Sequence, residues 1–203
     1  MVYGGGQWVS RDSVQEVLNP FDGSVVDTVP KGTTKDVEAA VISAERGFAE
    51  MKKLTAFDRY TVLMKAVDLI VERKEDLAKT ITLEEGKVIS EGRLEVDRCI
   101  QTITTSAEEA KRLNSEVIPL DAAPGNAMKF GFTLRVPVGV VAAVTPFNFP
   151  LNLVAHKIGP ALAAGNSVII KPASDTPLSA LKLTEVMIVA GFPPEPLQFI
   201  TGS

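Results

Sequence analysis

Residues 138–174 read VGVVAAVTPFNFPLNLVAHKIGPALAAGNSVIIKPAS, and this stretch decides the fold of the chain. Its apolar start, residues 138–144, predicts a buried strand, and a loop bounded by prolines follows. An apolar helix and a tight turn then lead into a second buried strand at residues 167–170, which completes a β-α-β unit. In such sheets ligands bind at the carboxyl ends of the parallel strands, so Asn148 and Lys171 lie where a ligand would bind.

A third strand is predicted at residues 198–201. The helix before it is bounded by Thr176 as N-cap, Pro177 at its first position and Gly191 just past its end. Parallel strands joined by helical crossovers predict an α/β fold, a partial doubly wound parallel sheet. Because nothing follows the last strand, we expect an apolar sheet edge and uncovered faces, and we interpret the chain as a fragment or a truncated product.

The first part of the chain predicts a helical segment between short strands and a β-arm or long hairpin. Short strands are expected within residues 7–30, around a turn at residues 19–23. Four helices are expected to follow: one starting after Thr33-Thr34, one near Thr55, one from about Glu75 that ends before Gly86, and one from about residue 88 to residue 113. The two strands of the arm are expected at residues 116–119 and 130–136.

The composition is ordinary for a soluble globular protein, with 203 residues, 45% apolar and 23% charged. A net charge of −4 gives no strong attraction to nucleic acid or to anionic membranes. One cysteine excludes an intrachain disulfide, and with one histidine it argues against a His/Cys metal site. The first residues lack a signal-peptide core and no apolar stretch is long enough for a membrane span, so we expect a cytoplasmic protein.

Three motifs together resemble the aldehyde dehydrogenase superfamily: TPFNFP at 145–150, HKIGPALAAGN at 156–166 and KPASDTP at 171–177. The segment PLNLVAHK is similar to the lactaldehyde and phosphonoacetaldehyde dehydrogenase branch. The resemblance implies that residues 1–136 form the N-terminal strands, helices and arm. It implies that residues 137–203 form the first half of a Rossmann-like NAD(P)-binding domain.

In this family an aldehyde, NAD(P)⁺ and water give a carboxylate and NAD(P)H, and the arm contributes to subunit contacts. The resemblance therefore implies an aldehyde substrate, a nicotinamide dinucleotide and a homodimer or homotetramer. The family's nucleophilic cysteine lies in a Gly-Gln-x-Cys loop and its general base in a Glu-Leu-Gly-Gly segment. Neither segment is in this sequence, so we expect no turnover from these residues alone.

Asn148 follows a buried strand and lies between Pro146 and Pro150, which restrict the loop. A rigidly held amide can stabilise a developing oxyanion, and the resemblance implies this role for Asn148 in aldehyde oxidation. The structural alternative is an asparagine that caps the following helix.

Lys171 ends a strand, and a lysine in that place is either a solvated surface charge or, as the resemblance implies, a contact for the adenosine-side ribose or its 2′-phosphate. Ser174 stands where many NAD-preferring relatives carry glutamate. Because serine does not repel a 2′-phosphate, the sequence favours NADP over NAD, unless Ser174 only begins a turn. The resemblance places further cofactor contacts at Thr145, Pro146, Phe147 and Gly202.

The resemblance also implies that Asn152, Leu153 and His156 shape the substrate end of the site. Relatives often carry an aromatic residue where His156 stands, so a histidine suggests a polar or anionic aldehyde. The alternative is a hydrogen-bonded histidine on the helix surface. Cys99, the single thiol, lies on an apolar helix stripe with Val96 and is not expected to be a nucleophile.

Two other functions remain open from the sequence. The chain could be a truncated, non-catalytic module for nucleotide binding or subunit pairing. It could also belong to a related reductase that acts on acyl phosphates.

Overall fold

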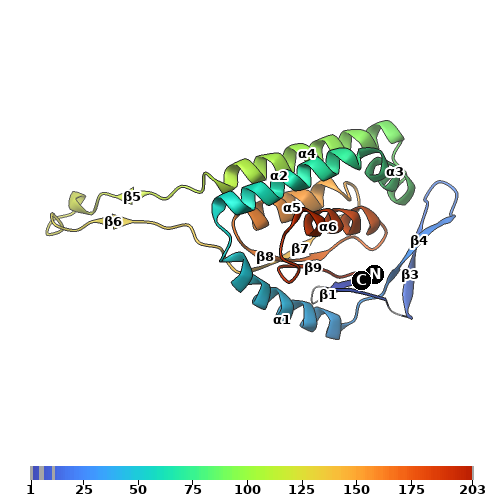
Figure 1. Ribbon diagram of the computed structural model, residues 1–203, viewed down its shortest axis with the longest axis horizontal. Coiled ribbons are helices and arrows are strands. Elements are labelled where there is room, and N and C mark those ends of the chain that lie inside the picture. Colours follow the sequence, from blue (N-terminus) through green and yellow to red (C-terminus); the bar gives the residue numbers. More distant parts are fainter. Residues whose placement is uncertain (1, 5–6, 11, 203) are drawn as a thin grey trace.

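The computed structural model describes residues 2–4, 7–10 and 12–202, and it has the mixed α/β architecture that the sequence predicts (Figure 1). The central sheet has the strand order β2-β1-β9-β8-β7. Its strands are β1 (Val2–Gly4), β2 (Gln7–Val9), β7 (Val140–Val144), β8 (Ser167–Lys171) and β9 (Leu197–Phe199). Strands β7, β8 and β9 are parallel, as predicted, whereas β1 runs antiparallel to both β2 and β9.

The expectation of uncovered faces is wrong, and the edge beyond β9 is partly covered, whereas β7 remains an edge strand with Val144 exposed. Strand β1 pairs with the outer side of β9, with Tyr3 opposite Phe199. Helix α1 (Thr34–Met51) packs on one face of the sheet, and α5 (Asn152–Ala163) and α6 (Leu178–Ala190) pack on the other (Figure 1). Contacts between segments this far apart in the chain leave no local sequence pattern, so the sequence did not reveal them.

The remaining long helices form a layer over α5 and α6: α2 (Ala56–Glu72), α3 (Lys74–Glu85) and α4 (Ile89–Ala110). Helices α1 and α2 begin where the sequence predicts, because Thr33 and Thr55 each form a capping box with the aspartate three residues on. Helix α3 ends at Gly86, whose φ of 85° is the left-handed conformation that glycine adopts most readily. One continuous hydrophobic core runs from the α2–α4 layer to the sheet.

The predicted turn at residues 19–23 joins β3 (Val14–Leu18) to β4 (Val25–Pro30). The Asn19 amide donates to the Ser24 carbonyl at 2.8 Å, and Gly23 takes a φ of 73°. This hairpin lies beside α3, where Pro20 would meet a Cβ placed at Gly86. The hairpin is therefore fitted to the α3–α4 turn.

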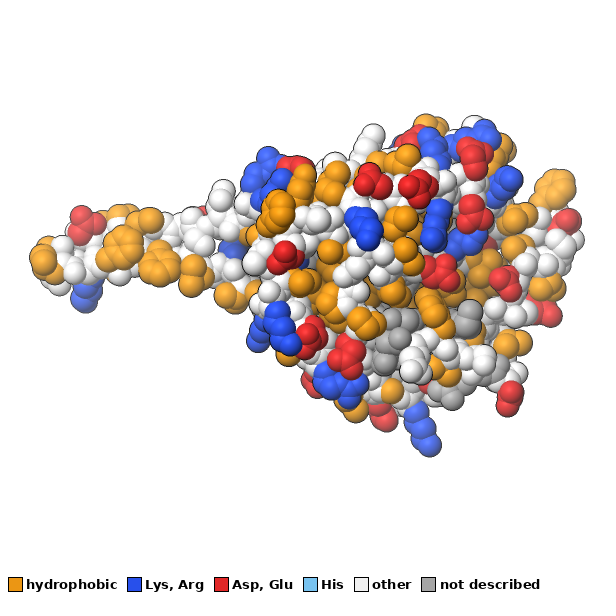
Figure 2. Space-filling view, in the orientation of Figure 1, with side chains coloured by type: hydrophobic (Ala, Val, Ile, Leu, Met, Phe, Trp, Pro, Cys, Tyr) orange, Lys and Arg blue, Asp and Glu red, His pale blue; other side chains and the backbone are white. Residues whose placement is uncertain are grey.

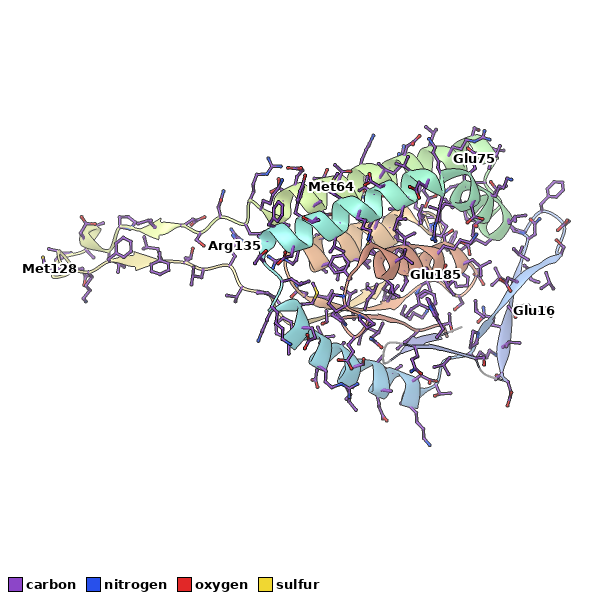
Figure 3. The ribbon with its side chains drawn as sticks, viewed as in Figure 1. Glu16, Met64, Glu75, Met128, Arg135 and Glu185 are labelled. Carbon is purple, nitrogen blue, oxygen red and sulfur yellow. The ribbon has the colours of Figure 1, made fainter. Side chains whose placement is uncertain are left out.

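The arm extends far from the body of the molecule (Figures 1 and 2). Its strands, β5 (Val117–Ile118) and β6 (Gly131–Phe132), are much shorter than predicted, and the 3-10 turn η1 (Leu120–Ala122) follows β5. No core lies against this ribbon to support a longer ladder. Met128 lies at its tip and Arg135 near its base (Figure 3), where the Arg135 guanidinium donates to the Asn114 carbonyl at 3.0 Å.

The predicted N-terminus of α6 is wrong by one residue, and its cap is wrong. Pro177 is the N-cap, with no side-chain cap of its own, and the helix begins at Leu178. The Thr176 hydroxyl instead donates to the Phe147 carbonyl at 3.4 Å. Buried Glu84 supplies the cap, since its carboxylate accepts from the backbone N–H groups of Leu178 at 2.6 Å and Ser179 at 2.9 Å.

Burial raises the pKa of Glu84 from 4.5 to about 7, although the N–H groups of Ser179 and Leu178 oppose the rise. Between these two pH values the unfolded chain releases this proton while the folded chain keeps it. The free energy of unfolding must therefore fall as the pH rises through this window, by on the order of 3 kcal/mol. In Glu84→Gln this contribution to the pH dependence disappears, which urea unfolding at pH 4.5 and pH 7.5 measures.

The control is Glu72→Gln, at an exposed position at the end of α2, which should keep the pH dependence of the parent protein. The same pH slope in Glu84→Gln as in the parent protein would contradict this assignment.

Candidate active site

The loop between β7 and α5 is fixed through its backbone. The Thr145 amide donates to the Lys171 carbonyl at 3.2 Å, and the Asn148 carbonyl accepts from the Lys87 ammonium at 2.6 Å. At its far end, the Leu153 amide donates to the Phe149 carbonyl at 3.0 Å. These bonds come from several elements, so the loop has little freedom to move as a unit.

Asn148 is exposed, and its carboxamide has no hydrogen-bond partner among the residues that the structure describes. It does not cap the following helix, so the structural alternative for this residue is wrong. Leu151 is the N-cap of α5, and the amides of Leu151 and Asn152 donate to the buried Glu95 carboxylate at 2.9 and 3.1 Å. The loop thus holds the Asn148 backbone and leaves its amide available to a ligand.

The predicted cofactor residues gather at the carboxyl edge of β7, β8 and β9. Lys171 is opposite Val144 in the register of β8 and β7, and it is partly buried. The Ser174 hydroxyl donates to the Gly202 carbonyl at 3.2 Å, so the segments that follow β8 and β9 meet. The Gln15 amide donates to the Ser174 carbonyl at 2.8 Å and ties the β3–β4 hairpin to this edge.

Several features of this edge suit a dinucleotide. Gly202 has a φ of 143°, which L side chains rarely adopt, and a Cβ at this position would lie 3.5 Å from the Gly32 carbonyl oxygen. The buried Thr145 hydroxyl has no partner within the described residues. Pro146 and Phe147 are exposed beside it. A cationic side chain and hydroxyls beside a strand-end glycine are groups of the kind that a phosphorylated, ribose-bearing ligand requires.

A cavity of about 540 Å³ lies between α4 and α5. Its lining residues are Arg98, Gln101, Thr102, Thr105, Ser106, Asn152, His156 and Pro160. Asn152 and His156 were both predicted to shape a substrate pocket. Leu153 does not line this cavity, because the stripe of α5 that faces it has a four-residue spacing and Leu153 lies one position away.

The α4 side of the cavity was not predicted. Residues Arg98, Gln101, Thr102 and Thr105 follow the three- and four-residue spacing of one helix face. The Thr102 hydroxyl donates to the Asn152 carboxamide at 3.0 Å, which joins the two helices across the cavity wall. The signal in the sequence was a polar stripe opposite the apolar stripe that contains Cys99, and such stripes are usually read as solvent-facing.

A sequence profile of the aldehyde dehydrogenase family matches residues 8–203 of this protein. The chain belongs to that family. It is 48% identical over 201 residues to a 3-sulfolactaldehyde dehydrogenase of Priestia aryabhattai, with 99% of this chain and 42% of the relative covered. It is 40% identical over 182 residues to a lactaldehyde dehydrogenase of Methanococcus aeolicus, with 90% and 38% covered.

Among solved aldehyde dehydrogenase-like structures, the chain superposes on NADP-dependent glyceraldehyde-3-phosphate dehydrogenase from Bacillus halodurans, complexed with NADP. The TM-score is 0.96 at 34% identity, covering 100% of this chain and 43% of the other. The fold is therefore that of the N-terminal portion of an aldehyde dehydrogenase. The chain spans 38–42% of the length of the two sequence relatives.

The one thiol of this aldehyde dehydrogenase chain is not placed for catalysis. Cys99 belongs to α4 and is fully buried on the side of this helix that faces the core. Burial raises the pKa of its thiol well above the usual range, and the nearby Glu95 raises it further. The thiol is thus held protonated and out of reach of a substrate, in agreement with the prediction from its apolar stripe.

Proposed function

We propose that this chain is the N-terminal part of an NAD(P)-dependent aldehyde dehydrogenase that oxidises a small, polar or anionic aldehyde to its carboxylate. Family membership supports the reaction class. The observation that carries the assignment of the site is the exposed Asn148 carboxamide, which lies on a backbone-fixed loop at the carboxyl end of β7. The chain's residues bind and orient, while the nucleophile and base come from outside these 203 residues.

The proposed role of Asn148 is to donate a hydrogen bond to the oxygen of the aldehyde as negative charge develops on it. A donor that is already oriented needs no reorganisation during the reaction, and such a donor contributes about 10²–10³ in rate. The backbone hydrogen bonds that hold this loop at Thr145 and Asn148 support that role.

The proposed cofactor site comprises Lys171, Ser174 and Gly202, with Thr145, Pro146 and Phe147 at the end nearer the aldehyde. The cofactor, when bound, accepts a hydride at its nicotinamide. We infer a preference for NADP, because the partly buried Ser174 carries no charge to repel a 2′-phosphate and Lys171 can attract one. The NADP complex of the Bacillus halodurans relative supports this inference.

The proposed substrate site is the α4–α5 cavity, which Asn152 and His156 line from the α5 side. Arg98 and His156 line it and no carboxylate does. The Arg98 guanidinium lies 5.9 Å from the centre of the Phe149 ring, and Phe149 follows Asn148 in the β7–α5 loop. A short aldehyde with an anionic tail would place the tail at Arg98 and the carbonyl near Asn148. The name of the Priestia relative denotes a substrate of this kind.

We further propose that the whole protein is a cytoplasmic homodimer or homotetramer. Among the helices in the described ranges, none combines the length and hydropathy that a membrane crossing requires. The arm supports the oligomer, because it exposes Met128 by 98% and Phe130 by 75%. In this proposal residues 1–136 supply the arm and the supporting helices, and residues 137–203 supply the first half of the cofactor domain.

The substitution Asn148→Ala in the complete enzyme tests the proposed function. It removes the oxyanion donor, so kcat should fall by about 10²–10³ while the dissociation constant of NADP stays within about threefold. The measurements are NADPH formation at 340 nm and cofactor binding by fluorescence titration. A variant with unchanged kcat would contradict the assigned role.

The 203-residue chain alone is the matched control, because it contains Asn148 and the proposed cofactor residues but lacks the nucleophilic cysteine segment of the family. It is expected to form no NADPH. Steady NADPH formation by the pure chain would contradict the proposal.

The substitution Arg98→Leu tests the anionic-substrate proposal. Loss of a charge-assisted hydrogen bond should raise KM for 3-sulfolactaldehyde by about 10- to 100-fold. The value of kcat/KM for lactaldehyde, which lacks the sulfo group, should change by less than about threefold. Arg93→Leu is the control, since Arg93 lies on the same helix but pairs with Glu75 at 2.9 Å, well away from the cavity. Equal losses with both aldehydes would contradict the proposal.

A further inference from the structure

Lys87 lies in the tight link between α3 and α4, directly after the left-handed Gly86. Its ammonium is 2.9 Å from one oxygen of Glu95 and 3.4 Å from one oxygen of Glu85. It also donates to the Asn148 carbonyl at 2.6 Å. A side chain from the helical layer thus reaches across to the very residue proposed to bind the oxyanion.

Glu95 holds the other side of the same loop. While one of its oxygens pairs with Lys87, the other accepts the amides of Leu151 and Asn152. A single ion pair therefore fixes the backbone at Asn148 and again three residues later, where α5 begins. We call Lys87 and Glu95 the loop clamp.

The surroundings of the clamp make it rigid. The side chain of Glu95 is 1% exposed and that of Lys87 is 14% exposed, so water and salt screen their attraction weakly. The Lys87 ammonium also lies 3.8 Å from the centre of the Phe149 ring, which fixes the residue after Asn148. With the carbonyl of Asn148 held and its neighbours packed, mainly the side-chain torsions of Asn148 remain free.

Buried ion pairs are inefficient as a source of stability, because desolvation offsets most of the attraction between the charges. An ion pair that also bonds a loop carbonyl and two helix amides instead defines a geometry. The apolar packing between α4 and α5 is extensive without it. The arrangement is thus suited to positioning more than to holding the fold together.

We propose that Lys87 and Glu95 are positioning residues for the reaction: they fix the backbone of Asn148, and with it the point from which its carboxamide reaches the developing oxyanion, without touching the substrate. This inference rests on the proposed role of Asn148. Its consequence is that weakening the clamp lowers the rate of the chemical step while leaving the binding of the aldehyde nearly intact.

The test is Lys87→Gln in the complete enzyme. A displacement of the amide by a fraction of an ångström to one ångström should lower kcat by about 10- to 100-fold, with KM for the aldehyde within about threefold. Lys87→Arg keeps a cation in the same place and should keep kcat within about threefold of the parent enzyme. A purely structural role would lower the amount of folded enzyme, seen by circular dichroism, and leave kcat per folded site unchanged.

The matched control is Lys74→Gln. Lys74 of α3 pairs with Asp97 of α4 at 2.6 Å, so it makes an ion pair to the same helix as Lys87 does, without a hydrogen bond to the loop among the described residues. It should leave kcat within about twofold of the parent enzyme. Glu95→Gln is a second test of the clamp, because glutamine keeps an acceptor for the Leu151 and Asn152 amides but removes the ion pair with Lys87. It should lower kcat in the same way as Lys87→Gln.

If Lys87→Gln does not fold, Glu95→Gln is judged by the same split between kcat and KM. The clamp is overturned if the folded variants keep kcat within threefold while Asn148→Ala loses about 10² or more, and the role of Asn148 then stands. If Asn148→Ala itself keeps full kcat, the proposed role of Asn148 fails and the clamp proposal fails with it.

Discussion

A buried glutamate from the helical layer fixes the start of each crossover helix, and the loops of the site depend on this arrangement. Helices α5 and α6 follow the parallel strands β7 and β8, and neither has a side-chain cap of its own. Glu95 from α4 caps the first and Glu84 from α3 caps the second. The free N–H groups at the start of both helices thus bond to carboxyl groups of the helical layer, which fixes the strand-end loops against it.

This arrangement explains why the polar loops of the site can be well placed without being part of the core. The backbone of each loop is bonded to a neighbouring element, while the side chains proposed to meet ligands stay accessible: Asn148 in the first loop, Lys171 and Ser174 after β8. The residues that hold these loops therefore come from residues 1–136, and the loop residues proposed to meet the cofactor and the oxyanion come from residues 137–203. The two parts share one hydrophobic core.

Much of the fold could be predicted because its signals are local. Thr33 and Thr55 mark the starts of α1 and α2, because each forms a capping box with the aspartate three residues later. Gly86 and Gly191 mark the ends of α3 and α6, because each adopts the left-handed conformation. The caps from Glu95 and Glu84 could not be predicted, since they act across 56 and 94 residues. The pairing of β1 with β9 joins opposite ends of the chain. In the candidate site, the residues at the strand ends could be predicted from the topology and the motifs. The α4 residues that line the cavity and the contact of Lys87 with the loop could not be predicted, because they depend on how the helices pack.

The most direct measurement is a double-mutant cycle between Lys87 and Asn148 in the complete enzyme, read as kcat per folded site. If Lys87 acts through Asn148, then Lys87→Gln should cost about 10- to 100-fold in the parent enzyme but less than about threefold once Asn148 is alanine. Losses that multiply fully in the double variant would mean that the two residues act independently, and would contradict the account of a loop held in place for catalysis.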